Sequence, residues 1–219
     1  SYMNEKLRIL LDKYKPSKRG IHSTANCYES AEYYQRQFNE WQQCGFTWLK
    51  LLVASDSQIN TVRLMRQRVP HIIPIIRFYF GDNRVPHTTL APDQVKPYLD
   101  TWGDVMIFET VNEPNNEWSG QMPPNWPDLL ANNWASMAQS ILNAGGIPLL
   151  PSIESWSYEK IFVPLWHVLI RKYRGIVEQS IVNCHNRTLN HPIGYNQDSG
   201  GYLGWTWFDN LVKDTLGEP

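Results

Sequence analysis

The feature that most constrains the fold is a regular alternation of short apolar segments with longer amphipathic ones. Short apolar runs bounded by Gly, Pro and Asn predict strands, whereas apolar residues three and four positions apart predict helices. The predicted strands are residues 20–24, 46–53, 71–80, 104–111, 147–153 and 178–184, and the predicted helices are residues 30–43, 57–68, 93–102, 128–143, 158–173 and 205–216. Strands that alternate with helices in this way form a parallel sheet covered by helices.

Two α/β architectures satisfy this alternation, a doubly wound open sheet and a (β/α)8 TIM barrel. The first strand-to-helix turn carries no Gly-x-Gly-x-x-Gly, and no phosphate-binding loop occurs in the chain, which disfavours a nucleotide-binding open sheet. Polar residues instead follow the ends of predicted strands, namely His22, Arg77, Glu113, Glu154 and His185. Barrel enzymes carry their active sites on this rim, so the sequence predicts a TIM barrel.

The predicted barrel is incomplete. The chain has 219 residues and about six β/α units, whereas a complete barrel typically needs about 250 residues. We therefore expect a single (β/α)-barrel catalytic domain over residues 1–219 that lacks its C-terminal strands. An open barrel exposes strand edges and apolar surface, so a missing segment or a second chain is expected to complete it.

Composition excludes several classes of protein. A formal net charge of -1 gives no reason to expect binding to nucleic acid or to a membrane surface. The longest apolar run, residues 72–80, is broken by a proline and an arginine, so no transmembrane helix is expected. No signal peptide is predicted, and secreted and cytoplasmic locations both stay open. The cysteines are too few and too widely spaced for a disulfide framework or a metal site: Cys27, Cys44 and Cys184.

The most informative segment is residues 105–115, VMIFETVNEPN, in which a buried strand leads directly into Asn-Glu-Pro-Asn. Pro114 cannot donate to a sheet and ends the strand, which places Glu113 at the rim. A partly desolvated carboxyl group at this position is expected to have a raised pKa. It could then stay protonated and donate its proton to a leaving oxygen.

Asn112-Glu113-Pro114 at the end of the predicted fourth strand resembles the acid/base signature of clan A glycoside hydrolases. The resemblance implies a (β/α)8 barrel that cleaves O-glycosidic bonds, β-linked ones above all, with retention of configuration. It implies that Glu113 is the general acid/base and that Asn112 contacts the 2-hydroxyl of the sugar. It also implies a carbohydrate partner and no metal or organic cofactor.

Glu109 lies on the same strand but is a poor partner for Glu113. Four strand residues separate their Cα atoms by about 13 Å, whereas a retaining pair needs its carboxyl groups about 5–5.5 Å apart. We expect Glu109 to be buried and paired with Arg77 or another cation. Arg77 either keeps a catalytic carboxylate ionised or forms a structural ion pair. Strict alternation points Asn112 away from Glu113, so the strand end must be distorted if both act in one site.

Other rim residues have two interpretations each. His185 either contacts substrate and supports the nucleophile or is a structural histidine, and His22 is a weaker case of the same kind. Tryptophans near the rim either pack in the core or stack on sugar rings. These tryptophans are Trp118, Trp156, Trp205 and Trp207, of which Trp156 and Trp207 are taken as substrate-binding residues.

The nucleophile of the family has no counterpart in the sequence. In clan A it is a Glu at the end of the seventh strand, and no matching strand end follows His185. The chain is then a piece of a longer enzyme, a partial barrel closed by another chain, or a barrel whose seventh strand is residues 202–207. The fallback acids are Glu154, Asp198 and Asp209.

Two other functions compete with the hydrolase. A catalytically inactive partial barrel could bind carbohydrate or act as a scaffold, since fold alone does not imply activity. An esterase on an α/β sheet needs a Gly-x-Ser-x-Gly nucleophile elbow, and the sequence contains none.

Overall fold

The predicted alternation of strands and helices is present in the computed structural model, which describes residues 4–24, 26–54 and 58–218. The strands are β1 (Gly20–His22), β2 (Trp48–Val53), β3 (Ile73–Phe78), β4 (Ile107–Glu109), β5 (Ile147–Pro148), β6 (Ile153–Glu154) and β7 (Cys184–His185). The helices are α1 (Glu5–Tyr14), α2 (Ala31–Trp41), α3 (Ile59–Arg68), α4 (Pro92–Trp102), α5 (Trp126–Ala144), α6 (Val163–Val177) and α7 (Trp205–Leu216). Shorter helical turns are η2 (Ser155–Ser157), η3 (Tyr158–Phe162) and η4 (Tyr202–Gly204). The start of the helix predicted from residue 57 lies outside the described residues.

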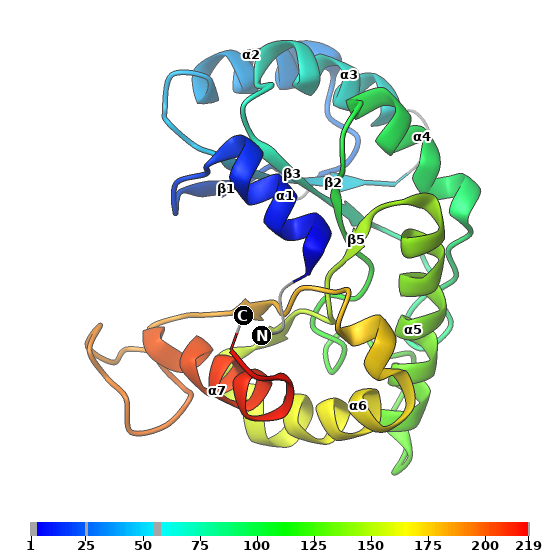
Figure 1. The fold of residues 1–219 in the computed structure, drawn as a ribbon, viewed down its shortest axis with the longest axis vertical. Helices are drawn as coiled ribbons and strands as arrows, with labels where there is room; N and C mark the ends of the chain where they lie inside the picture. The colour runs from blue at the N-terminus through cyan, green and yellow to red at the C-terminus, as the bar shows by residue number, and fades with distance from the viewer. Residues whose placement is uncertain (1–3, 25, 55–57, 219) are drawn as a thin grey trace.

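The strands form the curved parallel arrangement of a partial barrel. A five-stranded parallel sheet has the order β1-β2-β3-β4-β5, and β6 pairs in parallel with β7. Single bridges from Asn112 to Ser152 and from Leu149 to Ile181 connect the two groups. In Figure 1 helices α2 to α7 follow one another around the outside of this arc, whereas α1 lies near the middle of the view. Among the described residues no pairing joins β7 back to β1, so the arc is open between them.

Large apolar side chains hold the helices on the outer face of the strands. Each of five successive helices buries at least one large side chain: Phe38 in α2, Met65 in α3, Trp102 in α4, Trp134 in α5 and Trp166 in α6. Trp134 also donates a 2.7 Å hydrogen bond from Nε1 to the Leu149 carbonyl. This packing fixes α5 against the strand that ends near Glu154.

Helix α1 was not predicted, because its sequence reads as a polar, basic lead-in. The Asn4 side chain caps it by accepting a hydrogen bond from the Leu7 amide. Its buried Leu10 packs with Ile73, Ile107 and other residues at the N-terminal ends of the strands. The helix therefore covers the N-terminal ends of the strands. The candidate site lies at the opposite end of the arc, where the strands have their C-terminal ends.

Three differences from the predicted elements concern the C-terminal half. The strand predicted over residues 178–184 is reduced to β7, Cys184–His185, because a turn follows α6 at residues 178–180. Residues 202–207 are not a seventh strand, because η4 and the start of α7 occupy them. The strand predicted over residues 147–153 is split into β5 and β6 around Pro151, which lacks an N–H to donate to a neighbouring strand. The prediction of a helix over residues 205–216 is confirmed.

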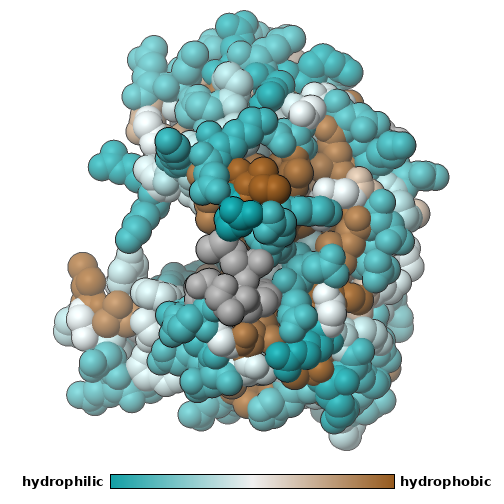
Figure 2. All heavy atoms as spheres, viewed as in Figure 1, coloured by the Kyte–Doolittle hydropathy of each residue, from teal (hydrophilic) through white to brown (hydrophobic). Residues whose placement is uncertain are grey.

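The molecular surface is polar at its periphery. Figure 2 shows hydrophilic side chains around most of the outline and apolar ones gathered nearer the middle of the view. A smaller apolar group lies at the lower left, where Figure 1 places the segment between β7 and α7. This segment contains the exposed hydrophobic residues Leu189 and Ile193. Within the described ranges, none of the helices combines the length and apolar character needed to cross a bilayer.

Candidate active site

Glu113 begins a tight turn four residues after the end of β4. Its φ is 43°, in the left-handed region that non-glycine residues seldom adopt. The Glu113 amide donates to the Ser152 carbonyl at 2.7 Å, and the Glu113 carbonyl accepts from the amides of Asn116 and Glu117 at 2.8 and 3.0 Å. These bonds hold the strained conformation, and strain of this kind is concentrated at functional sites.

The Glu113 carboxylate is held between two strand ends. His185, the last residue of β7, lies with Nδ1 2.8 Å from Glu113 Oε1, and Asn116 Nδ2 donates to Glu113 Oε2 at 3.0 Å. The Glu113 side chain keeps 20% of its surface exposed. A reacting group from solvent can therefore reach this carboxylate while His185 and Asn116 orient it.

Glu154 is the second carboxylate of this cluster. It ends β6 and is 2% exposed, and its Oε1 accepts a 2.8 Å hydrogen bond from the same Asn116 Nδ2 that binds Glu113. The two bonded oxygens are thus no more than about 6 Å apart, a distance at which one ionised carboxylate disfavours the ionisation of another. The buried Oε2 of Glu154 has no hydrogen-bond partner within the part of the chain that the structure describes.

The expectation of a raised Glu113 pKa is wrong for this structure. Burial raises the pKa of Glu113, but the hydrogen bonds from His185 and Asn116 and the positive charges of His185 and Arg187 outweigh it. The net effect lowers the pKa below its ordinary value. The sequence showed a strand-end carboxyl group near aromatic residues, but it gave no sign of the donors that surround the carboxylate.

Asn112 and Glu113 direct their side chains to different neighbours. Asn112 Nδ2 donates to Glu117 Oε1 at 2.8 Å, and Asn112 lines a cavity beside β3 and β4, whereas the carboxylate of Glu113 bonds to His185 and Asn116. The strand end is distorted at Glu113, which has a positive φ. The two side chains nevertheless share no hydrogen-bond partner among the described residues.

Glu109 lies below this rim and forms the ion pairs expected of it. Its fully buried carboxylate binds the Lys50 ammonium, and its Oε1 lies 3.8 Å from Arg77 Nε. Arg77 also approaches Glu117 Oε1 at 3.5 Å through a terminal guanidinium nitrogen. The ion pairs described for Arg77 are with Glu109 and Glu117 and not with Glu113. This arrangement favours the structural alternative for Arg77, which also lines the cavity.

Substitution of Glu109 by Ala should destabilise the fold strongly. Lys50 and Arg77, with side chains 15% and 24% exposed, would keep their charges beside an empty site. Loss of one partner of a buried pair typically costs about 3–5 kcal/mol of unfolding free energy. Urea denaturation followed by circular dichroism measures this cost.

The matched control for that experiment is Glu178→Ala. Glu178 pairs with Arg174 on the surface, where both side chains are half exposed, so the loss should stay below about 1 kcal/mol. Equal unfolding free energies for the two variants would contradict the structural role of the Glu109 pair.

The candidate stacking residues differ in exposure. Trp156 follows Glu154 in η2, is 38% exposed, and has the Arg187 guanidinium 5.7 Å from its ring centroid. Trp205 is 45% exposed at the start of α7. Trp207 is half-buried and packs against the main core. Trp118 is buried, which favours the packing alternative for this residue.

The remaining candidates do not join the cluster. His22 ends β1, where burial lowers its pKa and its Nδ1 lies 2.7 Å from the Ser23 carbonyl. Asp209 pairs with Lys213 at 2.9 Å within α7, and Asp198 binds Tyr195 and the Gly200 amide. No group of three or more His, Cys, Asp or Glu residues that could hold a metal ion occurs in the described ranges.

Asn116 and Glu117 are site residues that the sequence reasoning missed. Asn116 bridges the two carboxylates and Glu117 fixes the Asn112 amide. The only indication in the sequence was their spacing, three and four positions after Glu113. In a helical turn this spacing brings side chains to the same side as the first residue. The loop over residues 79–85 lines the cavity. The sequence placed its first two residues in the strand predicted over residues 71–80 and the others in a connection between a strand and a helix.

Comparisons with known proteins support the fold alone. No family model and no curated protein matches the chain. A solved structure from Sorangium cellulosum, described as a mandelate racemase/muconate lactonizing enzyme, matches with a TM-score of 0.50 and 13% identity, over 90% of this chain and 43% of that chain. This chain thus spans less than half of the length of that protein.

Two further structures match with lower scores. A β-mannanase from Thermomonospora fusca in complex with mannohexaose has a TM-score of 0.42 and 13% identity, over 91% of this chain and 88% of that chain. An AP endonuclease of family 2 from Brucella melitensis has a TM-score of 0.44 and 12% identity, over 91% and 76%. The sheet topology together with the likeness to the Sorangium cellulosum structure shows that this chain has an α/β fold of the TIM-barrel class, in an incomplete form.

Proposed function

We propose that this chain is the catalytic part of a retaining glycoside hydrolase that cleaves β-linked saccharides, with Glu113 as general acid/base. The observation that carries the proposal is the carboxylate pair at the rim. Glu113 and Glu154 share the Asn116 amide, so their bonded oxygens are no more than about 6 Å apart, a limit that admits the separation of about 5–5.5 Å in retaining pairs. The Asn-Glu-Pro signature at residues 112–114 supports the same assignment.

Glu113 is the better acid/base of the two carboxylates. It is partly exposed, and His185 and Asn116 hold both of its oxygens. In its acid role it gives a proton to the glycosidic oxygen, and in its base role it takes a proton from water. A lowered resting pKa suits the second role and opposes the first.

In this proposal, substrate binding raises the pKa of Glu113 and so lets it act as the acid. Asn116 is exposed and occupies the space between the two carboxylates. A sugar that displaces its amide removes one hydrogen bond that lowers the Glu113 pKa and excludes water from the carboxyl group. Both changes raise the pKa of Glu113.

Glu154 is the second carboxylate in this proposal. Within the described part of the chain its Oε1 bonds only to the Asn116 amide, so the same displacement uncovers it. The carboxylate then attacks the anomeric carbon, the bond to the leaving oxygen breaks, and the leaving oxygen receives the Glu113 proton. Water, deprotonated by Glu113, attacks the resulting glycosyl ester and releases Glu154.

A binding protein without activity is the second candidate function. The observation that favours it is the burial of Glu154, since a nucleophile must reach its substrate. Hydrolysis of aryl β-glycosides and β-1,4-linked oligosaccharides by the wild-type chain and by Glu113→Gln separates the two functions. The hydrolase requires product from the wild type and a large loss in the variant, whereas a binding protein gives no product with either.

Replacement of His185 by Ala should raise the pKa of Glu113, because the main hydrogen bond that lowers it is removed. A carboxyl group with a depressed folded pKa stabilises the fold above its unfolded pKa of about 4.3, and this contribution is lost as the pH falls through the folded pKa. The variant should therefore be less stable than the wild type at pH 7 and should approach it at pH 2–3. Carboxyl ¹³C NMR titration and urea denaturation at both pH values measure the two effects.

The control for this titration is His167→Ala, since His167 is exposed on α6. That substitution should leave the titration of Glu113 unchanged. An unchanged Glu113 pKa in His185→Ala would contradict the interaction between these residues.

A further inference from the structure

Ser152 holds the turn that carries Glu113 through its main chain. Its amide donates to the Val111 carbonyl at 2.9 Å, and its carbonyl accepts from the Glu113 amide at 2.7 Å. Between these two bonds it forms an isolated parallel bridge with Asn112. Ser152 is fully buried, and both of its main-chain groups are used on the side of β4. The place of Ser152 in the sheet therefore decides where the Glu113 turn begins.

One extra residue interrupts the sheet just below the rim, between β5 and β6. Leu149 bridges to Ile181, and Ile153 is paired with Cys184 further along the same two segments. Four positions separate these pairs on the first segment but three on the second, which is the signature of a bulge. Pro151 lies within it and has no N–H to donate. The main-chain pairing between the two segments is therefore broken at this point.

A hydrogen bond between side chains spans this break. Asn183 Nδ2 donates to Ser152 Oγ at 2.6 Å. Successive side chains of a strand alternate between two faces, so Asn183 lies on the same face as His185. Ser152 lies on the same face as Glu154, which is the partner of His185 in the pairing of β6 with β7. The Asn183–Ser152 bond thus forms the layer of side chains directly below the two rim residues.

This bond links the two segments that meet in the contact between Glu113 and His185. On one side, Ser152 accepts the hydrogen bond from the Glu113 amide. On the other side, Asn183 stands two positions before His185 in the chain. His185 Nδ1 in turn lies 2.8 Å from Glu113 Oε1. The four residues therefore form a closed loop of contacts, in which the Asn183–Ser152 bond fixes the distance between the two segments.

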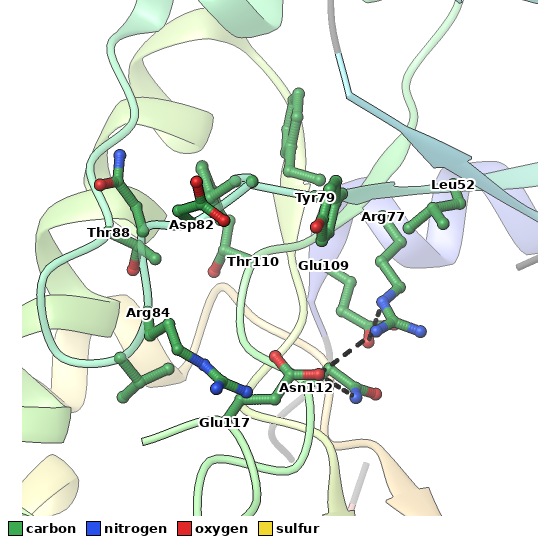
Figure 3. Close-up of a pocket in the computed structure, with 15 residues that line it drawn as sticks. Leu52, Arg77, Tyr79, Asp82, Arg84, Thr88, Glu109, Thr110, Asn112 and Glu117 are labelled. Carbon is green, nitrogen blue, oxygen red and sulfur yellow. Dashed lines mark hydrogen bonds and ion pairs between the residues drawn. The ribbon is translucent and has the colours of Figure 1, made fainter. Parts of the chain in front are cut away.

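The cavity side of the same strand end gives the Glu113 carboxylate no such support. Figure 3 shows Arg77, Glu109, Asn112 and Glu117 on that side, joined to one another by hydrogen bonds and ion pairs. Within the described residues, none of them bonds to the Glu113 side chain. The bond from β7 is therefore the contact that holds the carboxylate from outside its own turn.

We propose that Ser152 and Asn183 are positioning residues that set the separation of Glu113 and His185. Their hydrogen bond takes the place of the main-chain pairing that the extra residue interrupts. Without this bond, the end of β7 shifts relative to the turn, and the contact between Glu113 and His185 lengthens. The value of that contact for catalysis rests on the proposed function, whereas the positioning itself does not.

The test is a carboxyl ¹³C NMR titration of Glu113 in Ser152→Ala, in Asn183→Ala and in the double variant. Burial raises the pKa of Glu113, and the hydrogen bond from His185 is the largest of the effects that lower it. Neither substitution removes a charge, so a shift of this pKa reports a change in geometry. Each single variant should raise the pKa toward its value in His185→Ala without exceeding it. The double variant should match the single ones, because both substitutions remove the same hydrogen bond.

The matched control is Asn133→Ala, which removes another pair of an amide with a hydroxyl residue. Asn133 on α5 accepts from the Thr88 hydroxyl at 2.9 Å and donates to the Thr88 carbonyl at 2.6 Å. Its loss should lower the free energy of unfolding in urea but leave the Glu113 pKa unchanged. Asn183 is only partly buried, so Asn183→Ala carries the test if Ser152→Ala does not fold. An unchanged Glu113 pKa in folded Asn183→Ala would overturn the proposal, as would shifts that add up in the double variant.

Hydrolysis assays separate this proposal from the proposed function. A raised Glu113 pKa in the variants of a chain that cleaves neither aryl β-glycosides nor β-1,4-linked oligosaccharides would overturn the proposed function and leave the positioning role standing. Hydrolysis that needs Glu113, combined with an unchanged Glu113 pKa in both single variants, would do the reverse.

Discussion

Replacing Glu113 by Gln is expected to lower kcat/KM on β-linked oligosaccharides by about 10²–10⁴-fold, the usual contribution of a general acid/base. The Gln amide keeps the size of the side chain but has no acidic proton to give. The loss should be much smaller for a 2,4-dinitrophenyl β-glycoside, whose leaving group departs without protonation. Initial rates of reducing-end release and of dinitrophenolate release measure both effects.

Glu178→Gln is the matched control for this substitution. Glu178 follows α6 and pairs with Arg174 on the surface, so its replacement should leave both rates unchanged. Similar losses on the activated and unactivated substrates in Glu113→Gln would contradict an acid role. Full activity on oligosaccharides would remove Glu113 from the reaction altogether.

Replacing Glu154 by Ala is expected to lower the rate by more than about 10³-fold on every substrate, because the covalent step loses its nucleophile. Unlike the Glu113 variant, this one should be equally impaired on the activated aryl glycoside. Azide should restore turnover by entering the space of the lost carboxylate. The azide ion then displaces the aryl oxide and gives an α-glycosyl azide, with inverted configuration.

Fold integrity has to be checked for this variant, since Glu154 is buried. Glu154→Gln keeps the hydrogen bond to Asn116 within reach and serves as the second variant, with the same loss expected. Wild-type rates in a folded Glu154 variant would show that the nucleophile lies elsewhere, such as on a further strand outside this chain. That result would leave the acid/base role of Glu113 intact.

The order of strands and helices was readable from the sequence because each strand is short, apolar and bounded by turn residues. The helix over residues 205–216 has the bounds that its apolar spacing predicts. Helix α1 was missed because its contacts are with residues far away in the chain: Leu10 packs on strand ends, and Lys13 and Tyr14 bond to Asp104. The division of residues 147–153 into β5 and β6 depends on bridges to Ile181 and Asn112, which no local pattern encodes.

Part of the site could also be predicted from the sequence. Strand ends in a parallel sheet meet at one rim, so Glu113, Glu154 and His185 could be placed there from the sequence. His185 bonds to Glu113 directly, whereas the two carboxylates are linked through Asn116, whose position depends on a turn with a positive φ at Glu113. The direction of the Glu113 pKa shift follows from those contacts, and the cavity depends on how the loop over residues 79–85 folds back on β3 and β4.

The most direct measurement of the central claim is the anomeric configuration of the product that Glu113→Ala forms from a 2,4-dinitrophenyl β-glycoside in the presence of azide. In a retaining enzyme without its acid/base, the glycosyl ester forms and azide attacks it in place of activated water. The predicted product is therefore a β-glycosyl azide, identified by the anomeric coupling in its ¹H NMR spectrum. An α-glycosyl azide, or no effect of azide on a folded and slow variant, would contradict the assignment of Glu113 as the acid/base of a retaining glycoside hydrolase.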